Sequence, residues 1–314
     1  MASPETRERP KIVVLGGINM DVVATVQRMP EPGETVHGDG FFMAGGGKGA
    51  NQALAVSRLG AETRMVDRVG DDDFGRSLLD SMRTAGVDMS GVALDPANST
   101  GVAVIMVDDE GQNIIAEVYG ANRASDESQM EAAKLAMEGA DTLMLQLETP
   151  PEVSLAVARF ARDAGVRVVW DPAPAADMPA EGFVLADFLT PNETEAAELT
   201  GIRVTDVSSA RLAAEALLAR GAGAAIVKMG YEGVFGATRG EQYYVPPMNV
   251  DAVDSVAAGD AFGAGLAVAL SEGRGLHDAL RFGAAAGALA VTKPGAQGAM
   301  PYRAEVDELL RQAG

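Results

Sequence analysis

The chain has 314 residues and a formal net charge of −20, so it is long enough for two average domains or one large α/β domain, and its charge disfavours nucleic acid and anionic membranes as partners. Its 47% hydrophobic and 22% charged residues are ordinary for a soluble protein, and with no apolar run of membrane-spanning length and no signal-peptide core we expect a cytoplasmic protein. The absence of cysteine excludes disulfides, thiolate catalysis and cysteine-bound zinc, and two histidines leave little scope for a histidine-built metal site.

The first strand pattern follows a polar start, residues 1–10, which we expect to be a disordered tail. The apolar run at residues 11–15 ends in glycine, which predicts a buried parallel strand with a functional loop at its carboxyl end. In that loop, residues 17–21, Asn19 and Asp21 are two positions apart. An extended backbone would point both side chains to one side, where they could hold adjacent hydroxyls of a polyol. An Asx turn is the alternative.

Residues 44–52, A-G-G-G-K-G-A-N-Q, form a glycine-rich turn that leads into an amphipathic helical pattern. The P-loop pattern fails because Gly49 follows Lys48 in place of Ser or Thr, and a dinucleotide-binding fingerprint is weak because the segment does not follow the opening strand of a βαβ unit. Since glycines let the backbone approach a ligand, we interpret Lys48 and Asn51 as donors to a small polar molecule. A solvent-exposed lysine in a flexible loop is the alternative.

Alternating strand and helix patterns predict one α/β domain over residues 11–314. Two β-rich stretches interrupt the alternation, at about residues 35–43 and 100–118, and the turn D-D-E-G in the second predicts a hairpin. We expect them to form a lid over the main sheet. The predicted fold class is therefore doubly wound α/β, with a mostly parallel central sheet, helices on both faces and a small β-sheet lid. Polar residues such as Glu148 and Asn192 follow predicted strands, so ligands should bind at the carboxyl edge of the sheet.

Residues 250–270 carry the clearest chemistry. Within them, residues 257–260, A-A-G-D, precede an apolar run of helical length, so they should form the first turn of a buried helix whose N–H groups and dipole attract an anion such as phosphate. Asp260 would not attract that anion, but it could take a proton from a hydroxyl that attacks it. With the ordinary aspartate pKa of about 3.9 it would be ionised at neutral pH without special tuning. A helix cap is the alternative role.

Nearly the whole chain resembles the PfkB (ribokinase-like) carbohydrate kinases. The matching motifs run from V-V-L-G-G-I-N-M-D through P-G-E-T-V, G-G-K-G-A-N-Q-A, S-T-G-V-A, Q-L-E-T-P, D-P-A-P-A and T-P-N-E-T-E-A-A-E-L-T-G to V-D-S-V-A-A-G-D-A-F and A-V-T-K-P-G-A-Q. The order G-G-K-G-A-N, then A-A-G-D-A-F, is specific by itself. The resemblance implies transfer of the γ-phosphoryl group of ATP to the 5-hydroxyl of D-ribose, with Mg²⁺ and K⁺ as cofactors, and a homodimer formed through the lid.

The resemblance also implies a role for each matching residue. Asp260 would be the general base, and the anion hole would consist of Ala257, Ala258, Gly259 and Asp260. The implied sugar contacts are Asn19, Asp21, Gly47, Lys48, Asn51, Glu148 and Asp260. The implied nucleotide contacts are Asn192, Lys228, Gly230, Gly233 and Gly259, while Glu195 would act indirectly on magnesium. The implied loops around a monovalent cation contain Asp254, Val256, Ala290, Lys293, Gly295 and Ala299.

Three residues depart from the family pattern: Lys228 replaces a common Thr, Ala284 a polar neighbour of adenine, and Ala299 a Ser that can help to ligate the cation. The nucleotide preference and the strength of potassium activation therefore stay open. Family kinases for deoxyribose, fructose or a nucleoside are the nearest alternative, although Asn19 and Asp21 favour a substrate with adjacent hydroxyls. A sugar-binding protein without kinase activity is a second alternative, and a dinucleotide-dependent dehydrogenase is remote.

Overall fold

The computed structural model of the protein describes residues 9–175 and 178–313. The tail expected at residues 1–10 lies outside the described residues except for Arg9 and Pro10. The Pro10 carbonyl oxygen accepts a hydrogen bond from the Glu62 amide (2.8 Å). The chain is therefore tied to the main sheet from the residue before its first strand.

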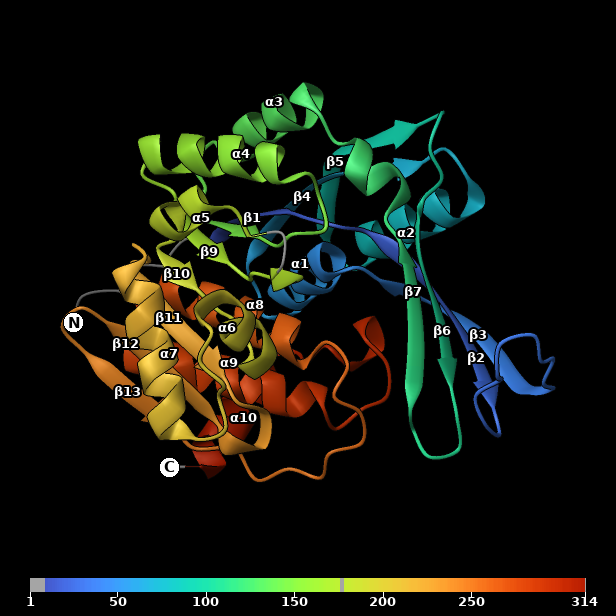
Figure 1. The fold of residues 1–314 in the computed structure, drawn as a ribbon. Helices are drawn as coiled ribbons and strands as arrows, with labels where there is room; N and C mark the ends of the chain where they lie inside the picture. The colour runs from blue at the N-terminus through green and yellow to red at the C-terminus, as the bar shows by residue number, and fades with distance from the viewer. Residues whose placement is uncertain (1–8, 176–177, 314) are drawn as a thin grey trace.

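A nine-stranded sheet lies at the centre of the described residues, in the order β13-β12-β11-β10-β9-β8-β1-β4-β5 (Figure 1). All neighbouring strands from β5 to β11 are parallel, and β12 is antiparallel to both of its neighbours. The mostly parallel sheet of the predicted fold class is confirmed. The strand bounds are Lys11–Leu15 (β1), Glu62–Gly70 (β4), Val87–Asp95 (β5), Thr142–Leu145 (β8), Arg167–Trp170 (β9), Phe188–Leu189 (β10), Ala224–Lys228 (β11), Val234–Thr238 (β12) and Gln242–Val245 (β13).

Helices cover both faces of this sheet, because its central strands are apolar on both sides. Val14 of β1 packs into one buried cluster and its neighbour Val13 into another, since successive side chains of a strand point to opposite faces. No helix among the described residues is both long and apolar enough to cross a membrane. The first cluster contains side chains of α1 (Lys48–Arg58), α2 (Asp73–Thr84), α8 (Ala258–Ser271), α9 (Leu276–Ala290) and α10 (Arg303–Gln312). The second contains side chains of α3 (Glu127–Ala136), α4 (Pro151–Asp163), α5 (Ala180–Leu185), α6 (Glu193–Thr200) and α7 (Val207–Ala219).

A second sheet, which we call the lid, stands beside the main one (Figure 1). Its described strands have the order β3-β2-β6-β7. The pair β2–β6 is parallel, whereas β2–β3 and β6–β7 are antiparallel. The lid strands are β2 (Asn19–Val26), β3 (Gly38–Gly46), β6 (Gly101–Val107) and β7 (Asn113–Val118). The predicted lid and its hairpin at residues 100–118 are thus present.

One local prediction was wrong, and the bounds of another are shifted. The loop expected at residues 17–21 ends early, because β2 begins at Asn19 and adds a fourth strand to the lid. The lid strand expected at residues 35–43 runs instead over Gly38–Gly46. β2 was missed because the chain passes from the main sheet into a second sheet within residues 16–18, and local patterns do not indicate to which sheet a strand belongs. The bounds of β3 are those of its pairing with β2, which the sequence pattern does not show.

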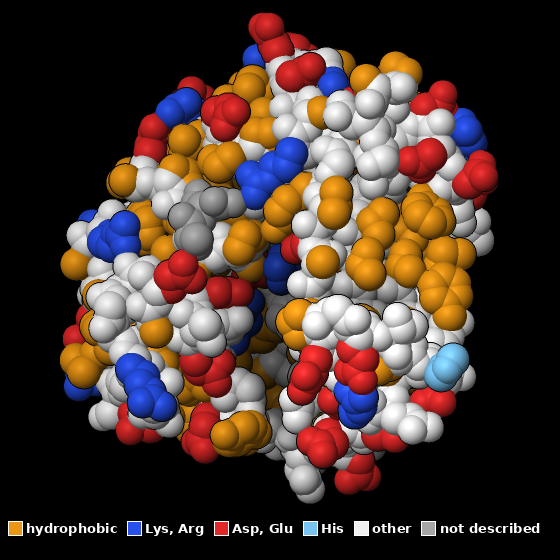
Figure 2. Space-filling model, turned by 45° about the vertical axis from the view of Figure 1, so that its right-hand side comes forward, with side chains coloured by type: hydrophobic (Ala, Val, Ile, Leu, Met, Phe, Trp, Pro, Cys, Tyr) orange, Lys and Arg blue, Asp and Glu red, His pale blue; other side chains and the backbone are white. Residues whose placement is uncertain are grey.

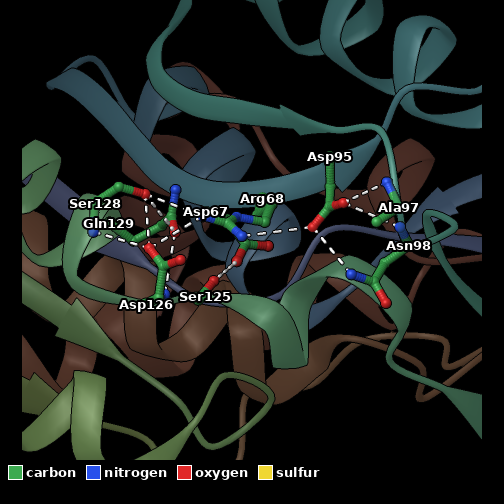
Figure 3. Close-up of polar contacts among 9 residues, drawn as sticks. All are labelled: Asp67, Arg68, Asp95, Ala97, Asn98, Ser125, Asp126, Ser128 and Gln129. Atoms are coloured by element: carbon green, nitrogen blue, oxygen red, sulfur yellow. Dashed lines mark hydrogen bonds and ion pairs between the residues drawn. The ribbon is translucent and has the colours of Figure 1, made fainter.

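The hairpin β6–β7 is fixed to β4 at both of its ends. Arg68 of β4 contacts Asp95 Oδ2, at the end of β5, at 3.5 Å and Asp126 Oδ1, the N-cap of α3, at 3.0 Å (Figure 3). Asp95 Oδ1 also accepts from the amides of Ala97 and Asn98, at 2.7 and 3.0 Å. Because β6 follows Asp95 and α3 follows β7, one arginine holds the chain before and after the hairpin.

The neighbouring Asp67 ties the start of the lid to the same strand. Its Oδ2 accepts from the Ile18 amide (3.1 Å) and its Oδ1 from Ser125 Oγ (3.3 Å). Complete burial raises the pKa of Asp67 well above its ordinary value. β4 therefore holds the segments that lead into β2 and out of β7.

Candidate active site

A cleft of about 740 Å³ lies where the parallel strands end. Its lining includes Lys48 at the start of α1, Asp171 after β9, Asn192 after β10, Lys228 at the end of β11, and Asp260 in α8. Figure 2 shows a hollow at the centre of one face, with acidic and basic side chains around it. Residues that are far apart in sequence thus meet at the edge of the sheet that the sequence indicated.

The first turn of α8 is uncovered. The residue before it, Ala257, has φ +58° and is the one non-glycine residue with positive φ among those described. No side chain caps the helix. A strained backbone residue followed by small side chains leaves the helix terminus, with its N–H groups and positive dipole end, accessible to an anion.

Asp260 does not cap α8, which removes that alternative. Its side chain turns to α1 instead, where Asn51 Nδ2 donates to Oδ2 (3.0 Å) and Gln52 Nε2 donates to Oδ1 (3.1 Å). Asp260 is buried, and burial raises its pKa, with a further upward contribution from Asp171, while Lys48 acts in the opposite direction. The prediction of an untuned aspartate was therefore wrong, because the sequence does not show this burial.

Lys48 is the first residue of α1 and is partly buried, so the exposed lysine in a flexible loop is also wrong. Burial alone would lower its pKa, but the carboxylates around it outweigh burial and leave the pKa raised. Lys48 therefore stays cationic beside Asp260. The surrounding carboxylates are those of Asp260, Asp171, Glu148 and Glu195.

The other predicted sugar contacts lie where the lid meets the main sheet. Glu148 Oε2 accepts from the Lys48 amide (2.9 Å), and burial raises the pKa of Glu148 to about 8. Burial, with Glu117 adding to it, raises the pKa of Asp21 to about 6. Asn51 Oδ1 is buried and has no hydrogen-bond partner among the described residues. An unsatisfied buried acceptor of this kind is suited to a ligand hydroxyl.

Glycines make room for these polar side chains. A Cβ on Gly17 would lie 2.2 Å from Glu148 Oε2, and one on Gly46 would lie 2.2 Å from Asp21 Oδ1. A Cβ on Gly101 would lie 2.1 Å from Asn19 Oδ1. The site thus depends on residues that need not touch a ligand.

Three side chains beside these contacts were missed. Asn122 Nδ2 donates to Asn19 Oδ1 (2.6 Å), and Asn19 Nδ2 donates to Glu117 Oε1 (3.2 Å). Glu117 is exposed in β7, and the pairing Asp21–Ala103–Glu117 across three strands puts it on the same lid face as Asp21. A charge within the apolar run I-I-A-E-V was the available signal for Glu117. The sequence carried no such signal for Gln52, because glutamine is common at every kind of position in helices.

Among the residues predicted to contact the nucleotide or its magnesium, Asn192 and Glu195 form a capping box at the start of α6. Asn192 Oδ1 accepts from the Glu195 amide and Glu195 Oε2 from the Asn192 amide, both at 2.8 Å. Lys228 Nζ lies 2.8 Å from Asp171 Oδ1. The predicted neighbours Gly230 and Gly233 have φ values of +51° and +84°, which glycine adopts readily.

The two loops predicted to enclose a monovalent cation do lie together. Asp254 Oδ1 accepts from the Val256 amide (3.0 Å) and Oδ2 from the Gly295 amide (2.8 Å). Lys293 Nζ pairs with Glu305 (2.9 Å), so only its backbone is available to this site. Ala290 ends α9, and Ala299 is buried. Within the described parts of the chain there is no cluster of three or more His, Cys, Asp or Glu side chains suited to a metal.

Residues 9–303 match the model of the pfkB family carbohydrate kinases. The chain is 38% identical over 305 residues to a ribokinase of Haemophilus influenzae, and the match covers 97% of this chain and 100% of that relative. It is 32% identical to a deoxyribokinase of Salmonella typhi, and this match covers 95% of this chain and 98% of that relative. A solved ribokinase of Arabidopsis thaliana complexed with ribose and ATP superposes with a TM-score of 0.88 at 33% identity, covering 96% of this chain and 99% of that one. The chain therefore belongs to the pfkB family of carbohydrate kinases.

Proposed function

We propose that this protein is an ATP-dependent sugar kinase that transfers the γ-phosphoryl group to the 5-hydroxyl of D-ribose and forms ribose 5-phosphate. The observation that carries the proposal is the buried carboxylate of Asp260, held by α1 beside the uncapped start of α8 with Lys48 next to it. Relatives named ribokinase, one of them solved with ribose and ATP, support the choice of ribose.

In this mechanism Asp260 accepts the proton of the sugar hydroxyl as that oxygen attacks phosphorus. The hydroxyl must lie in line with the leaving group, so most of the catalysis consists of positioning and charge stabilisation. The first-turn amides of α8, from residues 257–260, stabilise charge on the transferring group. Burial raises the pKa of Asp260 and so makes it a stronger base, while Lys48 acts in the opposite direction and favours the ionised form that can accept a proton.

At the opposite end, Asn192, Lys228, Gly230 and Gly233 are proposed to hold the nucleotide. Burial raises the pKa of Glu195, while Lys228 lowers it, so this carboxyl lies close to a cation in the cleft. One Glu195 oxygen accepts from the Asn192 amide at the start of α6, and the other could help to hold magnesium, which binds carboxylates directly or through water. Bound magnesium would supply positive charge to the phosphate oxygens.

Other family substrates remain as alternatives. The deoxyribokinase relative favours one of them, deoxyribose, whereas the carboxylates and amides along β2 and β7 offer acceptors for several hydroxyls. A site built to bond a hydroxyl rejects the analogue that lacks it. ADP release measured with ATP and ribose, deoxyribose, fructose or adenosine distinguishes these substrates, and release with none of them would point to a sugar-binding protein without kinase activity.

Replacement of Asp260 tests the proposed base. We expect Asp260→Asn to lower kcat with ribose by about 10² or more, because the amide cannot accept the proton, while the KM values for ribose and ATP change only a few-fold. Steady-state kinetics by ADP release measure this. Asp67→Asn is the matched control, since it also replaces a buried aspartate by its amide, but one whose carboxyl accepts from the Ile18 amide and Ser125 Oγ and has no proposed contact with a substrate. Near-normal turnover of Asp260→Asn would contradict the proposal that Asp260 is the general base.

Replacement of Asp21 tests the division into a sugar end and a nucleotide end. We expect Asp21→Ala to raise the KM for ribose by roughly 5-fold to 150-fold, because a sugar hydroxyl then loses its acceptor at about 1–3 kcal/mol. The KM for ATP should change by less than about 3-fold. An equal rise in both KM values would contradict the division.

The loop before α8 contacts the loop after α9, where Asp254 accepts a hydrogen bond from the Gly295 amide. This contact leads to a prediction about potassium. Asp254 and backbone carbonyls can provide oxygen ligands near the start of α8, whereas Ala299 offers no side-chain oxygen. We expect potassium to raise kcat, and to be needed at higher concentration than in a relative with Ser at this position. Turnover is measured in a bulky organic ammonium buffer while potassium is added at constant ionic strength. A flat titration would leave Asp254 as a brace for the start of α8.

The lid generates a prediction about assembly. Strand register places Phe41, Met43, Val104, Ile114 and Val118 on the lid face opposite Asp21, and each is between 47% and 65% exposed. Figure 2 shows hydrophobic side chains gathered on this side of the molecule. An apolar sheet face of this kind needs a partner, so we expect a homodimer that buries it. Sedimentation at micromolar concentration should give the mass of a dimer, and Ile114→Lys should give a monomer; a monomeric wild type would contradict this.

A further inference from the structure

A continuous set of buried hydrogen bonds joins the nucleotide side of the cleft to Asp260. At its centre is Gln52 of α1, which has no exposed surface. Its Nε2 donates to Asp260 Oδ1 (3.1 Å) and to Asp171 Oδ2 (3.2 Å). The other oxygen of Asp171 accepts from Lys228 Nζ (2.8 Å). Four side chains thus connect the end of β11 with the first turn of α8.

The orientation of the Gln52 amide is fixed by charge. Two carboxylates face one end of it, and only the NH₂ group can be stable there. The other end, Oε1, accepts from Gln146 Nε2, and Gln146 is also fully buried. Gln146 Oε1 is left without a partner among the described residues. A rotation of Gln52 would break three buried hydrogen bonds, so its side chain is held in one position.

Lys228 lies where the proposed phosphate would bind. A Cβ on Gly259, in the first turn of α8, would be 3.1 Å from Lys228 Nζ. The same ammonium group therefore faces Asp171 on one side and the helix terminus on the other. Asp171 and Asp260 repel each other, and Lys228 and the Gln52 NH₂ group together offset that repulsion.

We propose that Gln52 is a positioning residue, which holds the carboxylate of Asp260 toward the sugar hydroxyl by bracing it against Asp171 and Lys228. This inference rests on the proposed function, because it takes Asp260 as the base. Gln52 touches neither substrate in this arrangement. The nucleotide-side lysine then acts on the base through Asp171 and Gln52.

The charged and polar groups that face Asp260 determine whether its pKa rises or falls when Gln52 is replaced. These are Lys48, Asn51 and Gln52 of α1, Asp171 after β9, and Glu148 after β8. Burial and Asp171 raise the pKa of Asp260, whereas Lys48 and the amides of Asn51 and Gln52 lower it. Without the Gln52 donor, Asp260 should hold its proton to higher pH.

The experiment compares Gln52→Leu with wild type and with Gln129→Leu. Gln129 is also a buried glutamine, but its Oε1 accepts from the Asp126 amide at the start of α3 (Figure 3). It has no hydrogen bond with Asp260, whose side-chain donors are Asn51 and Gln52. We expect Gln52→Leu to lower kcat by roughly 10-fold to 100-fold, as for other residues that orient a reactive group, with both KM values within a few-fold. The acid limb of kcat should move to higher pH in Gln52→Leu and stay unchanged in Gln129→Leu.

Two additions keep the test decisive if Gln52→Leu does not fold. Gln52→Glu keeps the shape and at best donates to one carboxylate, so it should show the same direction of change. In Gln52→Glu/Lys228→Met the kcat losses should be non-additive, because residues that act as a unit are not independent. Additive losses, an unshifted acid limb, or a kcat equal to that of wild type would overturn the proposal.

A titration of Asp260 by ¹³C NMR, assigned with Asp260→Asn, separates this inference from the proposed function. It needs no turnover. A wild-type protein that phosphorylates no sugar would refute the proposed function. An Asp260 titration that is the same in wild type and in the Gln52 variants would refute the positioning role, whether or not the protein is a kinase.

Discussion

The structure depends on keeping one ionisable carboxyl, that of Asp260, buried at the edge of the sheet. A buried carboxylate is costly unless cations and donors surround it. One helix supplies these groups: Lys48, Asn51 and Gln52 lie within the first two turns of α1. The start of α1 therefore faces the start of α8, and the apolar side chains that both helices contribute to one buried cluster hold them there.

That approach requires the backbone to pack closely. A Cβ on Gly49 would lie 2.4 Å from the Gly16 carbonyl carbon, so the first turn of α1 rests directly on the chain that leaves β1. The glycine-rich segment before the helix thus serves the packing of α1 against β1 as much as any ligand. A phosphate-binding loop would need similar glycines so that its backbone N–H groups could approach the phosphate. Glycine content alone therefore did not distinguish a phosphate-binding loop from close packing of α1.

Charge is distributed unevenly over the molecule. The chain has a net charge of −20 and only five lysines. Two of these lysines, Lys48 and Lys228, lie in the cleft, and carboxylates lie close to both. The field that an incoming nucleotide meets is therefore weaker than the lysines alone would give. The helix dipole of α8, which no side chain caps, and ions that accompany the nucleotide supply the remaining positive potential.

Strand periodicity and turn chemistry, which are local properties, predicted the doubly wound sheet and the lid. The joint position of Asp260, Lys48 and Asn51 was implied by the resemblance to the family and is confirmed by their contacts. The sequence did not predict β2, since the change from one sheet to another leaves no local mark. Neither the raised pKa of Asp260 nor the bridge made by Gln52 was predicted, because both depend on burial among residues far apart in sequence.

The lid has a consequence for the order of events during turnover. Strand β2 begins with Asn19 and contains Asp21, and β3 ends one residue before Gly47, so several of the proposed sugar contacts are parts of the lid sheet or adjoin it directly. Any tilt of these strands would displace the groups proposed to hold the sugar. Sugar capture and exclusion of water would then be a single motion, and a kinase built in this way would have little opportunity to transfer phosphate to water while the sugar is absent.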